Sequence, residues 1–260
     1  MSGASAEALN VKAPASDLRF YRTCITAMAV VIVSGFVVQL AMGRSSFAAP
    51  FIIHAHAFAA MGFVGLVVTQ AWLAAAGQVK VHRTVGVVAV LVALALAVTG
   101  ILVTLSGVQT GRVPFFFQPQ HFLLANPASV LAFLGILAAA IAMRRRTDWH
   151  ARLQIGAFVM LMGPGFGRLL PMPLITPYAF EAAGLVALAV PVIGMVRDRQ
   201  VHGRAHPAWW VPVIVLVGVL VVSRLIAFSP AGEAIYAAVT SGTAMDGADG
   251  LLFPPPPPLK

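Results

Sequence analysis

The chain has 260 residues, of which 60% are hydrophobic and 10% are charged, and its mean hydropathy is +0.91. A composition this apolar lacks the polar side chains that a soluble globular surface needs, so a soluble fold is excluded. The net charge of +9 comes from 17 Lys and Arg residues against 8 Asp and Glu. We expect these cations to face the headgroups of a lipid bilayer and not nucleic acid.

A polar N-terminal segment, residues 1–21, comes first and lacks the sequence features of a signal peptide. Apolar segments of membrane-spanning length then follow, since about 20 helical residues cross the ~30 Å hydrocarbon core. The sequence predicts an all-α fold, a bundle of seven transmembrane helices within residues 22–228. The predicted spans are 22–43, 53–76, 84–105, 123–143, 150–170, 178–196 and 207–228.

The fifth predicted span contains a break signal. Gly163-Pro164-Gly165-Phe166-Gly167 stands directly before Arg168. Pro164 has no N–H to donate to the carbonyl four residues back, and the glycines leave the backbone permissive. We therefore expect the helix to kink or end here, either to line a cavity beside Arg168 or to pack against a neighbour.

The C-terminal segment, residues 229–260, is small and polar and contains five consecutive prolines, Pro254 to Pro258. Such a run favours polyproline II and does not pack a core. The sequence predicts a Pro-rich periplasmic tail that is largely disordered. A short amphipathic helix near Glu233–Thr240 is the alternative.

The distribution of Lys and Arg orients the bundle. A cytoplasmic N-terminus places most of them in cytoplasmic segments: Lys12, Arg19, Arg22, Lys80, Arg83, Arg144, Arg145, Arg146, Arg152, Arg197, Arg199 and Arg204. Arg44, Arg112 and Lys260 lie outside, and Arg168 and Arg224 lie within spans. The positive-inside rule then predicts a bacterial cytoplasmic (inner) membrane protein with a cytoplasmic N-terminus and a periplasmic C-terminus.

Ionisable side chains within the spans point to a first candidate site. Each costs about 2.5–3.5 kcal/mol on insertion scales, so each requires a partner or a function. Counting turns places six of them toward the outer leaflet, and Gln70 shares a helix face with His56. The predicted outer pocket, for a small anion or for protons, consists of His54, His56, Gln70, His121, Arg168, Glu181 and Arg224.

Within this set, Glu181 is expected to pair with Arg168 or Arg224, and a purely structural ion pair is the alternative. His54 and His56 point in nearly opposite directions on a helix, so the sequence predicts no metal cage.

Histidines at the cytoplasmic ends of two spans form a second candidate site. His82 begins the third span and His150 the fifth, so their depths agree. They are placed to ligate a b-type haem, with Arg83 and Arg152 near its propionates, or to contact a quinone. Alternatively, both histidines anchor the helices at the lipid interface. His202 and His206, in the loop 197–207, are expected to be solvated.

The series His54-x-His56, Gln70 and His82-Arg83-x-x-Gly86 resembles a group of uncharacterised multi-pass bacterial inner-membrane proteins. A second pattern of that group is matched by His150-Ala151-Arg152-Leu153 and Gly163-Pro164-x-x-x-Arg168. The resemblance covers about residues 50–170 and implies the topology and the choice of residues without implying an activity. The likeness to cytochrome b561 and ferric-reductase bundles is one of architecture alone.

Three functions remain open at this point. The first is a redox or small-ligand membrane protein that uses His82 and His150. The second is a transporter or sensor that uses the outer pocket. The third is an accessory or scaffold subunit without chemistry of its own, bound to other membrane subunits.

Overall fold

The computed structural model describes residues 15–45 and 47–256, and in these residues the chain is all-helical, without a β-strand. The helices are α1 (Ala15–Ala41), α2 (Phe51–Ala75), α3 (Val79–Gln109), α4 (Pro119–Ala142), α5 (Thr147–Val159), α6 (Gly163–Leu169), α7 (Met172–Ile175), α8 (Ala179–Ala187), α9 (Ala189–His202), η2 (Pro207–Trp209), α10 (Trp210–Ala227) and α11 (Pro230–Thr240). The chain thus runs as long helices joined by short loops, as a multi-pass membrane protein requires.

Six helical stretches of the described residues are long and apolar enough to cross a membrane: Ser16–Ala41, Phe51–Ala75, Val79–Gln109, Pro119–Ala142, Ala179–His202 and Pro207–Ala227. Each of the six corresponds to one predicted span; the stretch Ala179–His202 is α8 and α9 in succession, and Pro207–Ala227 is η2 followed by α10. Pro191 lacks the N–H that would bond to the carbonyl of Ala187, which accounts for the division between α8 and α9.

The fifth predicted span, 150–170, is not a single helix. α5 ends at Val159, and the amides of Met160, Leu161 and Met162 bond to carbonyls three residues back. α6 then begins at Gly163 with Pro164 in its first turn. The expected break at Pro164 is confirmed, and it divides this predicted span into two shorter helices.

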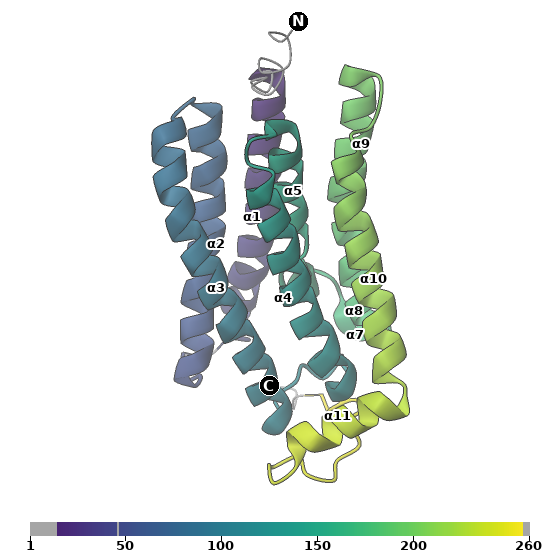
Figure 1. The fold of residues 1–260 in the computed structure, drawn as a ribbon. Helices are drawn as coiled ribbons and strands as arrows, with labels where there is room; N and C mark the ends of the chain where they lie inside the picture. The colour runs from purple at the N-terminus through teal and green to yellow at the C-terminus, as the bar shows by residue number, and fades with distance from the viewer. Residues whose placement is uncertain (1–14, 46, 257–260) are drawn as a thin grey trace, which may run out of the picture.

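The long helices stand side by side in the bundle, with α2 and α3 on one flank and α9 and α10 on the other (Figure 1). Neighbours along the chain pack as hairpins, α2 against α3 and α4 against α5. α1 packs against α2 and α6, and α10 packs against α4. α5 therefore lies between α1, α4 and α10.

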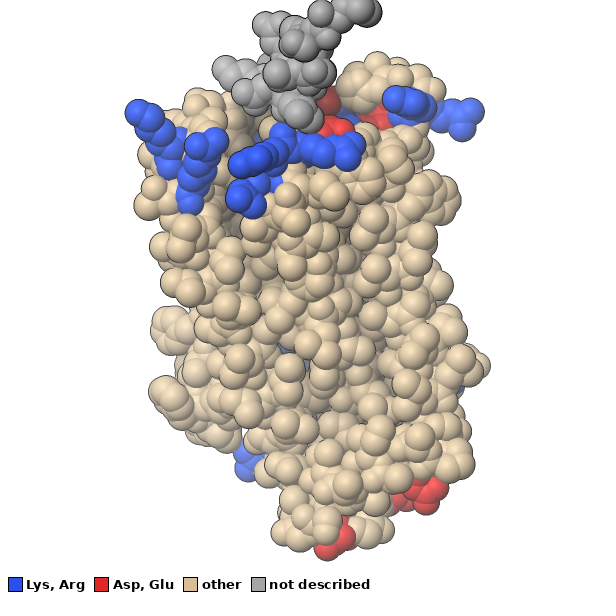
Figure 2. Space-filling view, in the orientation of Figure 1, with Lys and Arg blue, Asp and Glu red and all other residues tan. Residues whose placement is uncertain are grey.

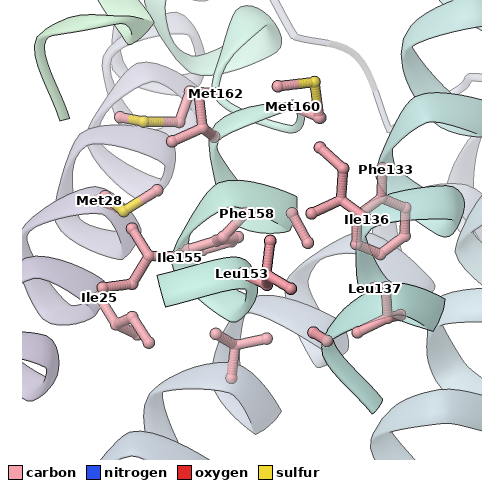
Figure 3. Packing of buried hydrophobic residues seen from close by; sticks show 14 of the residues in the cluster. Ile25, Met28, Phe133, Ile136, Leu137, Leu153, Ile155, Phe158, Met160 and Met162 are labelled. Carbon is pink, nitrogen blue, oxygen red and sulfur yellow. The ribbon is translucent and has the colours of Figure 1, made fainter. Parts of the chain in front are cut away.

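The largest buried cluster centres on α5. Ile155 and Phe158 are fully buried and face Met28 from α1 and Phe133 from α4 (Figure 3). A helix that is covered on every side is the core of its bundle. The lipid-facing surface is apolar instead, as on α3, where Val87, Leu91, Leu94, Val98 and Leu102 are exposed.

Glycines allow α1 and α6 to approach closely. A Cβ atom on Gly35 would lie 2.7 Å from the carbonyl oxygen of Gly165, and one on Gly165 would lie 2.9 Å from the Cα of Ile32. Real side chains do not tolerate such contacts, so both positions require glycine. This contact fixes the depth of Arg168, which follows on α6.

The expectation of a disordered tail after Phe228 is wrong for residues 229–256. They contain α11, which lies across the end of the bundle (Figure 1) and is capped by the hydroxyl of Ser229. Tyr236 on α11 is buried, and Gln118 and Gln120 bond to the backbone of the segment that follows it. The alternative of a short helix near Glu233–Thr240 is confirmed. The last prolines lie outside the described residues.

Most Lys and Arg side chains gather at one end of the bundle, where α1 begins and where the α2–α3, α4–α5 and α9–η2 loops lie (Figure 2). We call this end the basic end. Arg44 and Arg112 lie at the opposite end, which α11 covers. The charge asymmetry predicted from the sequence is therefore a feature of the folded molecule.

Candidate functional site

Two histidines from different hairpins meet at the basic end. His82 is the fourth residue of α3 and His150 is the fourth residue of α5. Their imidazole ring centroids are 6.3 Å apart, and the ring planes are inclined by 85°. The sequence predicted that these two side chains approach each other, and this prediction is confirmed.

Hydrogen bonds fix the tautomer of both rings. Nδ1 of His82 lies 3.2 Å from the carbonyl oxygen of Gln70, and Nδ1 of His150 lies 2.7 Å from that of Ala140. A carbonyl only accepts, so each Nδ1 carries the proton and donates it. In the neutral imidazole Nε2 is then an unprotonated acceptor. Histidines that bind metals are commonly held in this way, with the other ring nitrogen bonded to a carbonyl.

Gln70 belongs to this inner site and not to the outer pocket, so its assignment beside His56 is wrong. The side-chain Nε2 of Gln70 donates to the backbone carbonyl of His82 at 3.0 Å. The backbone carbonyl of Gln70 accepts from the ring of His82. Gly86 lies against the same amide. The pattern of Gln70, His82 and Gly86 therefore closes the α2–α3 hairpin.

The two arginines assigned to this site differ. Arg83 is exposed at the basic end. Arg152 is buried, and its Nε and Nη2 donate to the carboxylate of Asp198 at 2.8 and 2.9 Å. Its Nη1 donates to the carbonyl of Asp148 at 2.9 Å. Three of its five N–H donors are thus used by Asp198 and Asp148, and its expected role beside a haem propionate stays a prediction.

At the opposite end, Glu181 pairs with Arg224. Nη1 of Arg224 donates to Oε1 of Glu181 at 2.6 Å, so the predicted pairing of this carboxylate is confirmed. The guanidinium group also lies over the rings of Tyr178 and Phe228. These aromatic faces hold the cation in place as a cation–π arrangement.

His121 lies beside this pair. It is 5% exposed, and its ring contacts Phe180 and Phe228. Its Nε2 and the second carboxylate oxygen of Glu181 are both buried and lack a hydrogen-bond partner among the described residues. Buried polar atoms of this kind are normally satisfied, so these two mark a place for water, a proton or a small polar ligand.

The remaining residues of the predicted outer pocket lie apart from Glu181. His56 donates from Nδ1 to the hydroxyl of Thr99 at 3.2 Å, because that hydroxyl gives its own proton to the carbonyl of Ala95. Arg168 lies close enough to His56 for electrostatic interaction and stacks over Phe36.

His54 bonds to the carbonyl of Phe47 in the α1–α2 loop. The single predicted pocket is thus divided into a group around His56 and Arg168 and a group around His121, Glu181 and Arg224.

A polar cleft at the basic end was not predicted from the sequence. It has a volume of about 620 Å³ and is lined by Asp17, Arg146, Asp148, Trp149, Arg152, Asp198, His202, Arg204, Ala205, His206 and Pro207. At its floor Asp198 is fully buried, and Oδ2 accepts from Arg152 and from the indole Nε1 of Trp209, both at 2.8 Å. This carboxylate therefore joins α5, α9 and η2.

The rim of the cleft joins further segments. Arg197 pairs with Asp17 of α1 at 2.5 Å, and His202 lies 3.2 Å from the same carboxylate. Since α9 continues to His202 instead of ending at 196, these side chains project from a helix and not from a loop. His202 is exposed, as expected, although it lies on a helix, whereas His206 is partly buried, so the expectation that His206 is solvated is wrong. The sequence signal that could have indicated this cleft is the position of Asp17, Asp148 and Asp198, each of which lies close to Arg residues in the chain.

His206 is held as a neutral ring. Its Nδ1 accepts from the amide of Ala208 at 3.1 Å, so Nε2 carries the proton and donates to Asp148 at 3.0 Å. Burial lowers the pKa of His206, although the bond to Asp148 opposes this effect.

No protein-family model, curated protein or solved structure matches this chain. Within the described residues, no group of three or more His, Cys, Asp or Glu side chains is placed to hold a metal ion. The paired histidines therefore contribute two ligands at most to any metal centre.

Asp198→Asn should destabilise the protein strongly. The substitution leaves the buried guanidinium group of Arg152 without its counter-charge, a change that typically costs about 3–5 kcal/mol. Asp148→Asn is the matched control, because that carboxylate is half exposed and its loss should cost about 0–1 kcal/mol. Denaturant unfolding in mild detergent measures both values. Similar losses for the two variants would show that Asp198 does not hold the helices together.

Proposed function

We propose that the chain is a multi-pass protein of the bacterial inner membrane that crosses the bilayer seven times, with its N-terminus in the cytoplasm. The six long apolar stretches supply six crossings. α5 and α6, which together contain 20 residues, have the length of one further crossing. The basic end then faces the cytoplasm, in agreement with the positive-inside rule.

Reporter fusions test this topology. Alkaline phosphatase fused after Lys260 should be active, because the C-terminus lies in the periplasm. The same enzyme inserted in the loop at Arg145 should be inactive, and a fluorescent protein at these two sites should give the reverse pattern. An active phosphatase at Arg145 would contradict the proposed orientation.

We further propose that His82 and His150 are the axial ligands of a b-type haem and that the protein takes part in membrane electron transfer. The main support for this proposal is that the two ring centroids are 6.3 Å apart. In addition, the Nδ1 hydrogen bonds leave both Nε2 atoms unprotonated. Imidazoles that share a metal through nitrogens about 2 Å from it have ring centroids roughly 6 Å apart.

The donor set also favours haem over a bare metal ion. A bare ion would need additional protein ligands, and the described residues provide no group of three. A haem would need only two protein ligands, which His82 and His150 would provide, and it would supply one-electron transfer at this site. Arg83, exposed one residue after His82, is the cation available for a propionate.

The outer group around Glu181 supports a second candidate, a transporter or sensor that binds protons. The observation that favours it is the pair of buried, unpartnered atoms, Nε2 of His121 and Oε2 of Glu181. Arg224 holds the carboxylate in place from the other side. This function requires that the purified protein is colourless.

Spectroscopy of the protein purified in mild detergent with added haemin tests the haem proposal. We expect a Soret band and sharp visible bands on reduction with dithionite. His82→Ala and His150→Ala should each lose the bis-histidine spectrum, because one axial ligand is gone. His54→Ala is the matched control and should retain it, since His54 bonds only to a loop carbonyl at the opposite end. Haem that binds equally to all three variants would contradict the proposal.

A further inference from the structure

We propose that the polar cleft at the basic end binds an anion that carries a phosphate group. Neither His82 nor His150 lines this cleft, so anion binding here does not depend on the haem proposal. Its volume of about 620 Å³ is large enough for a phosphorylated headgroup or metabolite. Its lining comes from the beginning of α1, the start of α5, the end of α9 and the loop before η2.

Positive charge is left over in this cleft. The three carboxylates already have partners: Asp198 binds Arg152, Asp17 binds Arg197, and Asp148 bonds to His206. Arg146 and Arg204 line the same cleft and form no ion pair among the described residues. Three guanidinium groups line the cleft, and Arg197, which lies outside the lining, pairs with Asp17. Two carboxylates then remain against the three lining arginines, so the site favours an anion.

The cleft is also built to hold its side chains in position. Arg146 stacks on the ring of Trp149 at 5.3 Å, and Trp149 in turn meets the ring of His206 edge-on at 5.2 Å. Below them, the ring of Tyr21 lies 5.4 Å from the guanidinium carbon of Arg152. The hydroxyl of Tyr21 is buried without a partner among the described residues, and its charged neighbours include Arg152 and Asp17.

Phosphate is the anion that this arrangement favours. Planar guanidinium groups bind phosphate oxygens through paired hydrogen bonds, and Arg146 and Arg204 line this cleft without a salt bridge among the described residues. The phosphate has two potential sources, because the basic end lies at the level of lipid headgroups and also faces water. The experiment therefore presents each source separately.

The test measures the thermal midpoint of the full chain in mild detergent. The first probe is inorganic phosphate against sodium chloride of equal ionic strength. The second is phosphatidylglycerol against a diacylglycerol with the same acyl chains, which differs by lacking the phosphoglycerol headgroup. We expect at least one phosphate-bearing probe to raise the midpoint by several degrees, since a ligand that binds the folded state stabilises it. Arg146→Gln/Arg204→Gln should lose this shift.

Arg145→Gln/Arg199→Gln is the matched control, because it removes the same charge from the α4–α5 loop and from the adjoining end of α9 without touching the cleft lining. The control should keep the full shift. A shift with the lipid alone identifies a headgroup site, and a shift with inorganic phosphate identifies a site open to soluble phosphate. The proposal is overturned if neither probe shifts the wild-type midpoint, or if both double variants respond alike.

Discussion

The buried ion pair between Arg152 and Asp198 is the interaction on which the rest of the bundle depends. α5 is covered on every side, and a charged residue in such a helix is tolerated only with a buried counter-charge. Asp198 supplies that charge from α9, and Trp209 bonds to the same carboxylate from η2. The pair thereby fixes the rotation and the depth of the central helix.

Two consequences follow from a fixed α5. His150 lies two residues before Arg152, so its ring is held at the depth of His82 on α3. Each ring also bonds to a backbone carbonyl of the preceding helix, Gln70 in one hairpin and Ala140 in the other. The two hairpins thus use the same device, a histidine that closes the hairpin through Nδ1 and presents Nε2. The same helix, α5, also contributes Asp148, Trp149 and Arg152 to the lining of the polar cleft.

The sequence was informative where one physical constraint acts alone. Hydrocarbon thickness fixes helix length, so six predicted spans each correspond to one helical stretch, and the missing N–H of Pro164 accounts for the break in the fifth predicted span. A lone carboxylate in an apolar helix needs a cation, which made the partner of Glu181 predictable. Gln70 was assigned to the wrong end because helix periodicity gives a shared face and not the partner across the loop.

The cleft was missed because the segment 197–207, which contains Asp198, was expected to be a loop, whereas α9 extends to His202. Likewise, the prolines at the end of the chain led to the prediction of a disordered tail in place of α11. Tyr236 of α11 is buried because α10 and α4 provide a surface for this helix, and the sequence alone does not reveal that surface.

We propose that His82 and His150 would hold a haem iron, and their ring planes are nearly perpendicular, inclined by 85°. Electron paramagnetic resonance of the ferric, haem-loaded protein tests this claim most directly, because the spread of the low-spin signal depends on the angle between the two imidazole planes. We expect a strongly anisotropic low-spin signal, as perpendicular axial imidazoles give. A high-spin signal, or the less anisotropic low-spin signal of parallel rings, would contradict it.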